Sequence, residues 1–97
     1  SVRPQTNMSD LPERREWRTS IGRLSYILLV DQFGYVTDSE TSPSPFAGGS
    51  ATVSYADFLS GKRHSLIRST FGEAVLDEAL LLVTRNAKLL SGSSPAP

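Results

Sequence analysis

Residues 70–90 have the sequence TFGEAVLDEALLLVTRNAKLL, the longest segment in which the apolar spacing and the end signals agree. Its apolar residues recur at alternating spacings of four and three, the pattern of one face of an α-helix. Thr70 and Glu73 have the spacing of a capping box, and Gly92 follows where a left-handed C-cap would fall. The stretch therefore predicts an amphipathic helix over residues 71–90.

Two residues depart from the two-sided pattern of this helix. Asn86 falls inside the apolar arc, and Leu81 falls inside the polar arc. An Asn at a buried helix seam can fix register and oligomeric state. The apolar face either packs within its own domain or binds a partner, and both interpretations stay open.

A second long helix is predicted near the N-terminus. Asp10 can cap it, Pro12 suits its first turn, and apolar residues follow at spacings of four, three and four, namely Trp17, Ile21, Leu24 and Leu28. The alternative makes residues 24–30 a buried strand, residues 31–34 a turn and residues 35–37 the returning strand of a hairpin. The unbroken apolar spacing favours the helix.

Residues 37–52 (TDSETSPSPFAGGSAT) are rich in Ser, Thr, Pro and Gly, which predicts a disordered linker. After it, Ser54 can cap a short helix over residues 55–60 that Gly61 ends. Another short helix is expected over residues 62–69.

The predicted fold class is mostly α: a small helical hairpin or bundle with two long helices, two short ones and the linker. The alternative is an α+β fold with a hairpin at 24–37. The expected organisation is one small domain over residues 10–92, between a flexible arm at 1–9 and a flexible tail at 93–97.

The composition of the chain argues against several classes of function. Ten basic and ten acidic residues cancel, so there is no overall charge to attract nucleic acid or an anionic membrane. The absence of cysteine excludes disulfides and thiolate metal sites. The longest apolar runs, YILLV at 26–30 and ALLLV at 79–83, are too short to span a bilayer. A soluble protein is expected.

No catalytic or metal motif is found. His64 is the only histidine and has no companion ligand at metal-site spacing. No serine lies in a G-x-S-x-G sequence, and Gly48-Gly49 lacks the Lys and Ser/Thr of a phosphate-binding loop. The sequence therefore predicts a protein that is not an enzyme, with no cofactor and no metal.

The expected function is that of a protein–protein interaction or assembly subunit. Its predicted partner interface consists of the apolar helix faces and Asn86: Trp17, Ile21, Leu24, Leu28, Leu76, Leu80, Val83, Asn86, Ala87 and Leu90. The alternative is a nucleic-acid-associated accessory protein that uses two short basic patches: Arg14, Arg15, Arg18, Lys62, Arg63 and Arg68.

Ser65 is a candidate phosphorylation site. It follows Lys62-Arg63-His64 and precedes an apolar residue, an arrangement that basophilic kinases favour. A phosphate there would add negative charge beside two cations and could reorder the segment.

Overall fold

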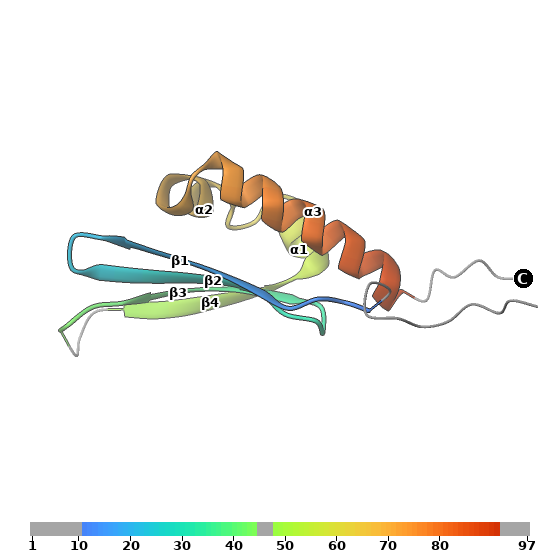
Figure 1. Cartoon of the computed structure of the whole chain (residues 1–97), viewed down its shortest axis with the longest axis horizontal. Coiled ribbons are helices and arrows are strands. Elements are labelled where there is room, and N and C mark those ends of the chain that lie inside the picture. The colour runs from blue at the N-terminus through green and yellow to red at the C-terminus, as the bar shows by residue number, and fades with distance from the viewer. Residues whose placement is uncertain (1–10, 45–47, 92–97) are drawn as a thin grey trace, which may run out of the picture.

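A computed structural model describes residues 11–44 and 48–91, and its fold is α+β (Figure 1). Four strands come first and three helices follow. The strands are β1 (Arg15–Ile21), β2 (Leu24–Val30), β3 (Tyr35–Thr41) and β4 (Gly48–Ser54); the helices are α1 (Tyr55–Leu59), α2 (His64–Phe71) and α3 (Glu73–Leu90). The strands form one antiparallel sheet in the order β1-β2-β3-β4.

The mostly α prediction is wrong, because the expected first helix is the β1–β2 hairpin. In this hairpin Trp17 lies opposite Leu28, and Ile21 lies opposite Leu24. Residues directly opposite in an antiparallel pair share a face of the sheet. The four–three–four spacing is symmetric about the turn, so a helix and a hairpin both place these four residues on one face. The spacing alone could not separate the two folds.

β2 and β3 form the hairpin that the alternative described. The Asp31 side chain closes its turn: Oδ1 accepts hydrogen bonds from the backbone N–H groups of Phe33, Gly34 and Tyr35 at 2.8, 3.0 and 2.9 Å. Gly34 has φ 113°, a conformation that residues with a Cβ resist. The returning strand runs on to Thr41, beyond the expected residue 37.

The linker prediction over residues 37–52 is also wrong for most of that stretch. Thr37 belongs to β3 and Thr52 to β4, and their Oγ1 atoms lie 2.8 Å apart across the two strands. Ser39 and Ser50 are cross-strand neighbours in the same way, and β-branched Thr is favoured in strands. Phe46 lies outside the described residues.

The short helices follow the sequence signals more closely. Ser54 caps α1 as predicted, with its Oγ accepting the Asp57 N–H at 3.1 Å. The predicted capping box of the long helix is wrong: Thr70 lies within α2, and Gly72, with φ 99°, is the residue between α2 and α3. The long helix ends at Leu90 with Ser91 as its C-cap, and Gly92 lies outside the described residues.

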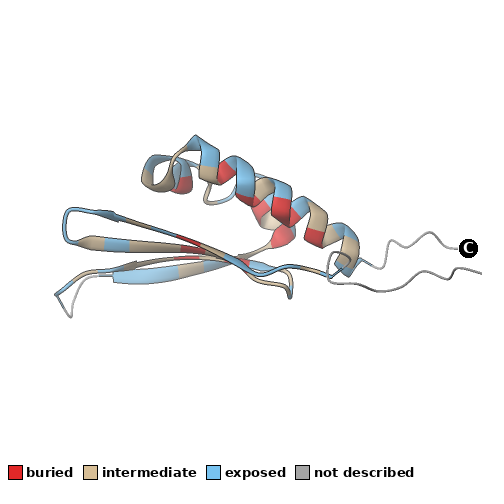
Figure 2. Ribbon diagram, in the orientation of Figure 1, coloured by how far each residue is buried: buried red, intermediate tan, exposed pale blue. Residues whose placement is uncertain are grey.

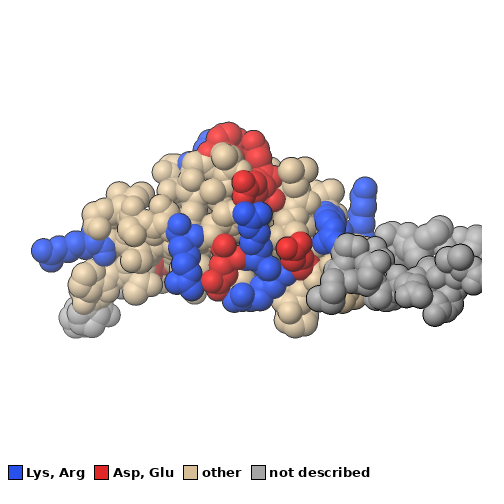
Figure 3. Space-filling view, viewed as in Figure 1, with Lys and Arg blue, Asp and Glu red and all other residues tan. Residues whose placement is uncertain are grey.

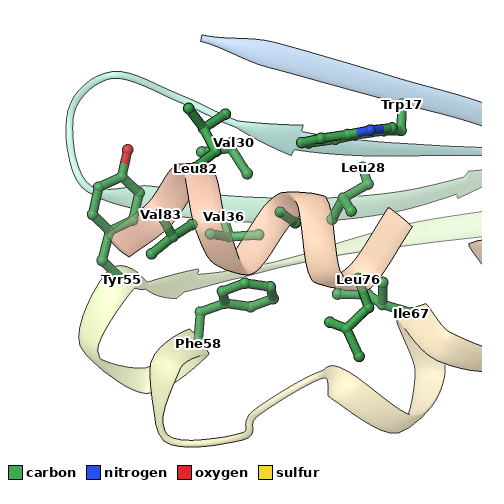
Figure 4. Close-up of a cluster of buried hydrophobic side chains, with 11 residues drawn as sticks. Trp17, Leu28, Val30, Val36, Tyr55, Phe58, Ile67, Leu76, Leu82 and Val83 are labelled. Atoms are coloured by element: carbon green, nitrogen blue, oxygen red, sulfur yellow. The ribbon is translucent and has the colours of Figure 1, made fainter. Parts of the chain in front are cut away.

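The helices cover one face of the sheet, and buried positions gather between the two layers (Figure 2). The largest side chains of this core are drawn in Figure 4. The buried apolar residues are Trp17, Leu28, Val30, Val36, Tyr55, Phe58, Ile67, Leu76, Ala79, Leu82 and Val83. Within residues 11–44 and 48–91, no helix is both long and apolar enough to cross a membrane.

Candidate functional site

The apolar face of α3 packs on the protein's own sheet. Of the predicted interface, the buried members are Trp17, Leu28, Leu76, Val83 and Asn86. The partly buried members are Leu24, Leu80 and Ala87. Ile21 and Leu90 are 51% and 45% exposed. Most of the predicted interface is therefore occupied within the chain, although the prediction of a protein partner is not tested by this.

Asn86 has a structural role inside this core. Its Oδ1 accepts the backbone N–H of Glu13 at 2.9 Å, and its Nδ2 donates to the Glu13 carbonyl at 2.8 Å and to the Tyr55 hydroxyl at 3.0 Å. The Tyr55 hydroxyl donates in turn to the carbonyl of Asp31, and burial raises its pKa. The Asn86 amide thus hydrogen-bonds to the backbone of Glu13, in the segment just before β1.

The predicted basic patches do not form an unpaired cationic surface. Each of their six cations has a carboxylate within 4.0 Å: the pairs are Arg14–Glu16, Arg15–Glu78, Arg18–Glu16, Lys62–Asp57, Arg63–Asp38 and Arg68–Glu73. Hydrogen bonds from Arg18 and Arg14 lower the pKa of Glu16. Figure 3 shows basic and acidic side chains interleaved on one side of the molecule. The nucleic-acid alternative stays a prediction, without support from this charge arrangement.

The side-chain contacts that the structure describes for His64 are with Phe58. Its Nε2 lies 2.6 Å from the Phe58 carbonyl oxygen, and its ring packs edge-on against the Phe58 ring. Among residues 11–44 and 48–91, no group of three His, Cys, Asp or Glu side chains could hold a metal ion. Ser65 is exposed in the first turn of α2, so the phosphorylation prediction stays open.

The two edges of the sheet differ in charge. The backbone N–H of Asp31 donates to the Tyr35 carbonyl oxygen, so these two residues form a hydrogen-bonded pair at the turn between β2 and β3. Along each strand the backbone groups of successive residues point alternately to one neighbouring strand and to the other, so this pair and the register assign the direction at every position. In β1, Glu16, Arg18 and Ser20 therefore direct their backbone groups away from β2. Arg14 and Arg18 both bind Glu16 at this edge. Charged side chains discourage the pairing of an edge strand with another chain.

The strand at the opposite edge, β4, carries no charged side chain. The backbone N–H of Tyr55 donates to the Gly34 carbonyl oxygen at 2.8 Å, just beyond the end of β4. Two residues along, Val53 lies opposite Val36, and these two form the next hydrogen-bonded pair between β4 and β3. Alternation then directs the backbone N–H and C=O groups of Gly48, Ser50 and Thr52 away from β3. These outward groups define the β4 edge, and all three residues are exposed. β4 (GGSATVS) contains no charged residue and no proline, and its pairing with β3 has no break in register.

Sequence reasoning missed the β4 edge, although a signal for it was present. Residues 50–53 alternate polar Ser50 and Thr52 with apolar Ala51 and Val53, the period of a half-buried strand. The flanking Gly and Pro residues outweighed this short pattern and favoured a linker. The edge is visible only once β3 is known to pair on the other side.

Gly48 brings the start of β4 close to β3. Its φ is 112°, and a Cβ at this position would lie 2.6 Å from the Glu40 carbonyl oxygen. Only glycine combines this φ with so close an approach. The beginning of the β4 edge therefore depends on that residue.

A cavity of about 160 Å³ lies between α2 and the sheet, next to β4. The sheet contributes Tyr26, Asp38, Glu40 and Ala51 to its lining, and α2 contributes Leu66 and Phe71. Arg63 also lines the cavity, and its Nε and Nη2 donate to Asp38 Oδ2 and Oδ1 at 2.8 and 2.7 Å. Arg63 has φ 70°, and the Asp38 hydrogen bonds raise its pKa. This ion pair holds the α1–α2 connection against β3.

Comparison of the chain with protein-family models, with curated proteins and with solved structures finds no match.

Proposed function

We propose that this protein is a non-enzymatic assembly subunit in which two copies join through the β4 edge. The observation that carries the proposal is the contrast between the two sheet edges. β1 presents Glu16 and Arg18, with Arg14 beside them, whereas β4 presents only Gly48, Ser50 and Thr52. An edge strand without charge, proline or bulge is a template for another strand.

A second copy is the simplest strand to complete this edge. A two-fold axis places identical strands antiparallel, and two-fold dimers are the commonest closed assembly of soluble proteins. With the axis at Ala51, Ser50 of each copy lies opposite Thr52 of the other. Their outward peptide groups then exchange hydrogen bonds as an antiparallel pair. The side chains at these positions are small and uncharged, so they neither repel the second copy nor clash with it.

Sedimentation of the wild type beside Ser50→Lys tests the proposal. The wild type is expected to form a concentration-dependent dimer. A lysine on the edge should weaken association by about tenfold or more, because the charge must approach its copy across the two-fold axis. A wild type that stays monomeric at the highest soluble concentration would overturn the proposal.

Ser39→Lys is the matched control. Ser39 lies directly opposite Ser50, on the interior strand β3 and on the same face of the sheet. A lysine at Ser39 adds the same charge to the sheet without altering the β4 edge. Its dimer should match that of the wild type, and equal loss of association in both variants would count against the β4 edge.

The chain lacks cysteine, so a single introduced thiol reports which edge meets its copy. In the proposed register the two Ala51 residues form a non-hydrogen-bonded pair, about 4.5 Å apart at Cα. That distance suits a disulfide. Ala51→Cys is expected to form a covalent dimer under mild oxidation, whereas Ser20→Cys on the β1 edge should not. The reverse result would contradict the proposed arrangement.

A further inference from the structure

The cavity under α2 has the size of one side chain. Its volume is about 160 Å³, and an apolar cavity of about 150 Å³ is large enough to hold benzene. Sites for drug-sized molecules occupy about 300 Å³ or more. The cavity therefore suits a small group, such as the end of a side chain, rather than a nucleotide or a large metabolite.

Of the two carboxylates that line the cavity, Asp38 has an ion-pair partner among the described residues and Glu40 has none. Arg63 binds both oxygens of Asp38, so the charges of these two residues cancel. Glu40 makes no ion pair with any cation of the described residues. Its hydrogen bond is a long one, from the Tyr26 hydroxyl at 3.5 Å. Since removing a charge from water is unfavourable unless it is paired, the partly buried Glu40 gives the cavity a net negative charge that a ligand cation would balance.

The remaining walls suit an aliphatic stem. Leu66 and Phe71 line the cavity from α2, and Gly49 and Ala51 line it from β4. Gly49 has no side chain and Ala51 has only a methyl group, so neither fills the space in front of it. Phe71 also supplies an aromatic ring to this wall, and a cation is attracted to the face of such a ring.

We propose that this cavity binds a cation carried on an aliphatic stem, either a primary ammonium or a guanidinium. Glu40 is its charge partner, the Tyr26 hydroxyl lies beside that carboxylate, and Leu66 and Phe71 contact the stem. The same chemistry occurs in a free alkylamine and in the Lys or Arg side chain of a polypeptide. The site does not depend on whether the β4 edge forms a dimer.

Titration of the ¹⁵N-labelled protein with n-butylammonium tests the site, and 1-butanol is the neutral probe of similar shape. Saturable shifts are expected at the amides of Gly49, Ala51 and Phe71. The ammonium should bind at least about tenfold more tightly than the alcohol, the value of one charge-assisted hydrogen bond. Equal binding of the two probes, or no shift with the ammonium, would overturn the proposal.

Glu40→Gln removes the proposed charge partner and keeps the shape of the side chain. It should lose the preference for ammonium over alcohol, while Asp77→Asn should keep it. Asp77 is an exposed carboxylate on α3 without an ion pair among the described residues, so both variants change the net charge by the same amount. Loss of binding in both variants would mean nonspecific charge attraction and would reject the site.

A third titration distinguishes the two sources of the cation. The probe is a blocked tripeptide, acetyl-Ala-Lys-Ala-amide. Tighter binding of the peptide than of butylammonium would assign the cavity to a polypeptide partner. Tighter binding of the free amine would assign the cavity to a small metabolite. In either case Glu40→Gln should weaken the binding.

Discussion

At the scale of single residues, Asn86 joins α3 to the segment before β1 and to α1 by hydrogen bonds. Its amide offers one acceptor and two donors, and all three meet partners on Glu13 and Tyr55. The Asn86 side chain is fully buried and Tyr55 is also buried, so loss of the amide would remove the hydrogen bond to the Tyr55 hydroxyl inside the core, together with both bonds to Glu13. Buried polar groups of this kind stabilise modestly when paired and destabilise strongly when left alone.

Asn86→Leu should therefore lower the free energy of unfolding by about 3 kcal/mol, since three hydrogen bonds worth about 1 kcal/mol each are lost. Urea unfolding followed by circular dichroism measures the change. The control is Thr84→Ala on the exposed side of the same helix, where the hydroxyl donates to the Leu80 carbonyl of its own helix. That variant should stay within about 0.5 kcal/mol of the wild type. An equal, small effect in both would show that the Asn86 network is not needed.

At the scale of elements, α3 separates core from surface along its length. Val83 is fully buried against the sheet, whereas Leu81 is 72% exposed. The sequence predicted the apolar face correctly but not which surface covers it. In the structure, Trp17 and Leu28 of the sheet contribute to the core that covers this face.

Val83→Asp and Leu81→Asp place the same carboxylate on the two sides of α3. Val83→Asp should unfold the protein or cost about 4 kcal/mol or more, because the charge enters the core. Leu81→Asp should change stability by less than about 0.5 kcal/mol. Thermal unfolding by circular dichroism checks both. If Val83→Asp left the fold intact and altered only the mass in solution, α3 would be an interface between copies and not part of the core.

At the scale of the whole molecule, the fold is two layers with one face of the sheet covered by helices (Figure 1). Such a sheet has two edges, and a meander leaves its first and last strands at those edges. The β1 edge is charged and carries the Asn86 contact beyond its start, whereas the β4 edge is uncharged and exposed. β4 also lines the cavity under α2.

Amide exchange across the molecule should show this asymmetry directly. In the proposed dimer the N–H groups of Ser50 and Thr52 become hydrogen-bonded, so their exchange should slow as protein concentration rises. The outward N–H groups of Glu16 and Arg18 should exchange at the same rate at all concentrations. Heteronuclear spectra recorded after transfer to deuterated solvent give these rates. Concentration-dependent protection at β1 instead of β4 would place the interface at the β1 edge and contradict the proposed dimer.

The sequence by itself determined the features whose signals lie within a few residues of one another. These are the long amphipathic helix over 73–90, the Ser54 cap of α1 and, among its alternatives, the turn at Asp31. Each depends on local hydrogen bonds or on one repeating spacing. Such signals do not change with the rest of the fold.

Only the tertiary structure decided whether residues 15–30 form a helix or a hairpin, because the spacing of Trp17, Ile21, Leu24 and Leu28 fits both. β4 likewise became a strand through its pairing with β3, across an intervening loop. Pairing of this kind depends on contacts between distant residues, and local propensity does not encode them. The free edge and the cavity exist only as consequences of that pairing, so the sequence could not reveal the candidate sites.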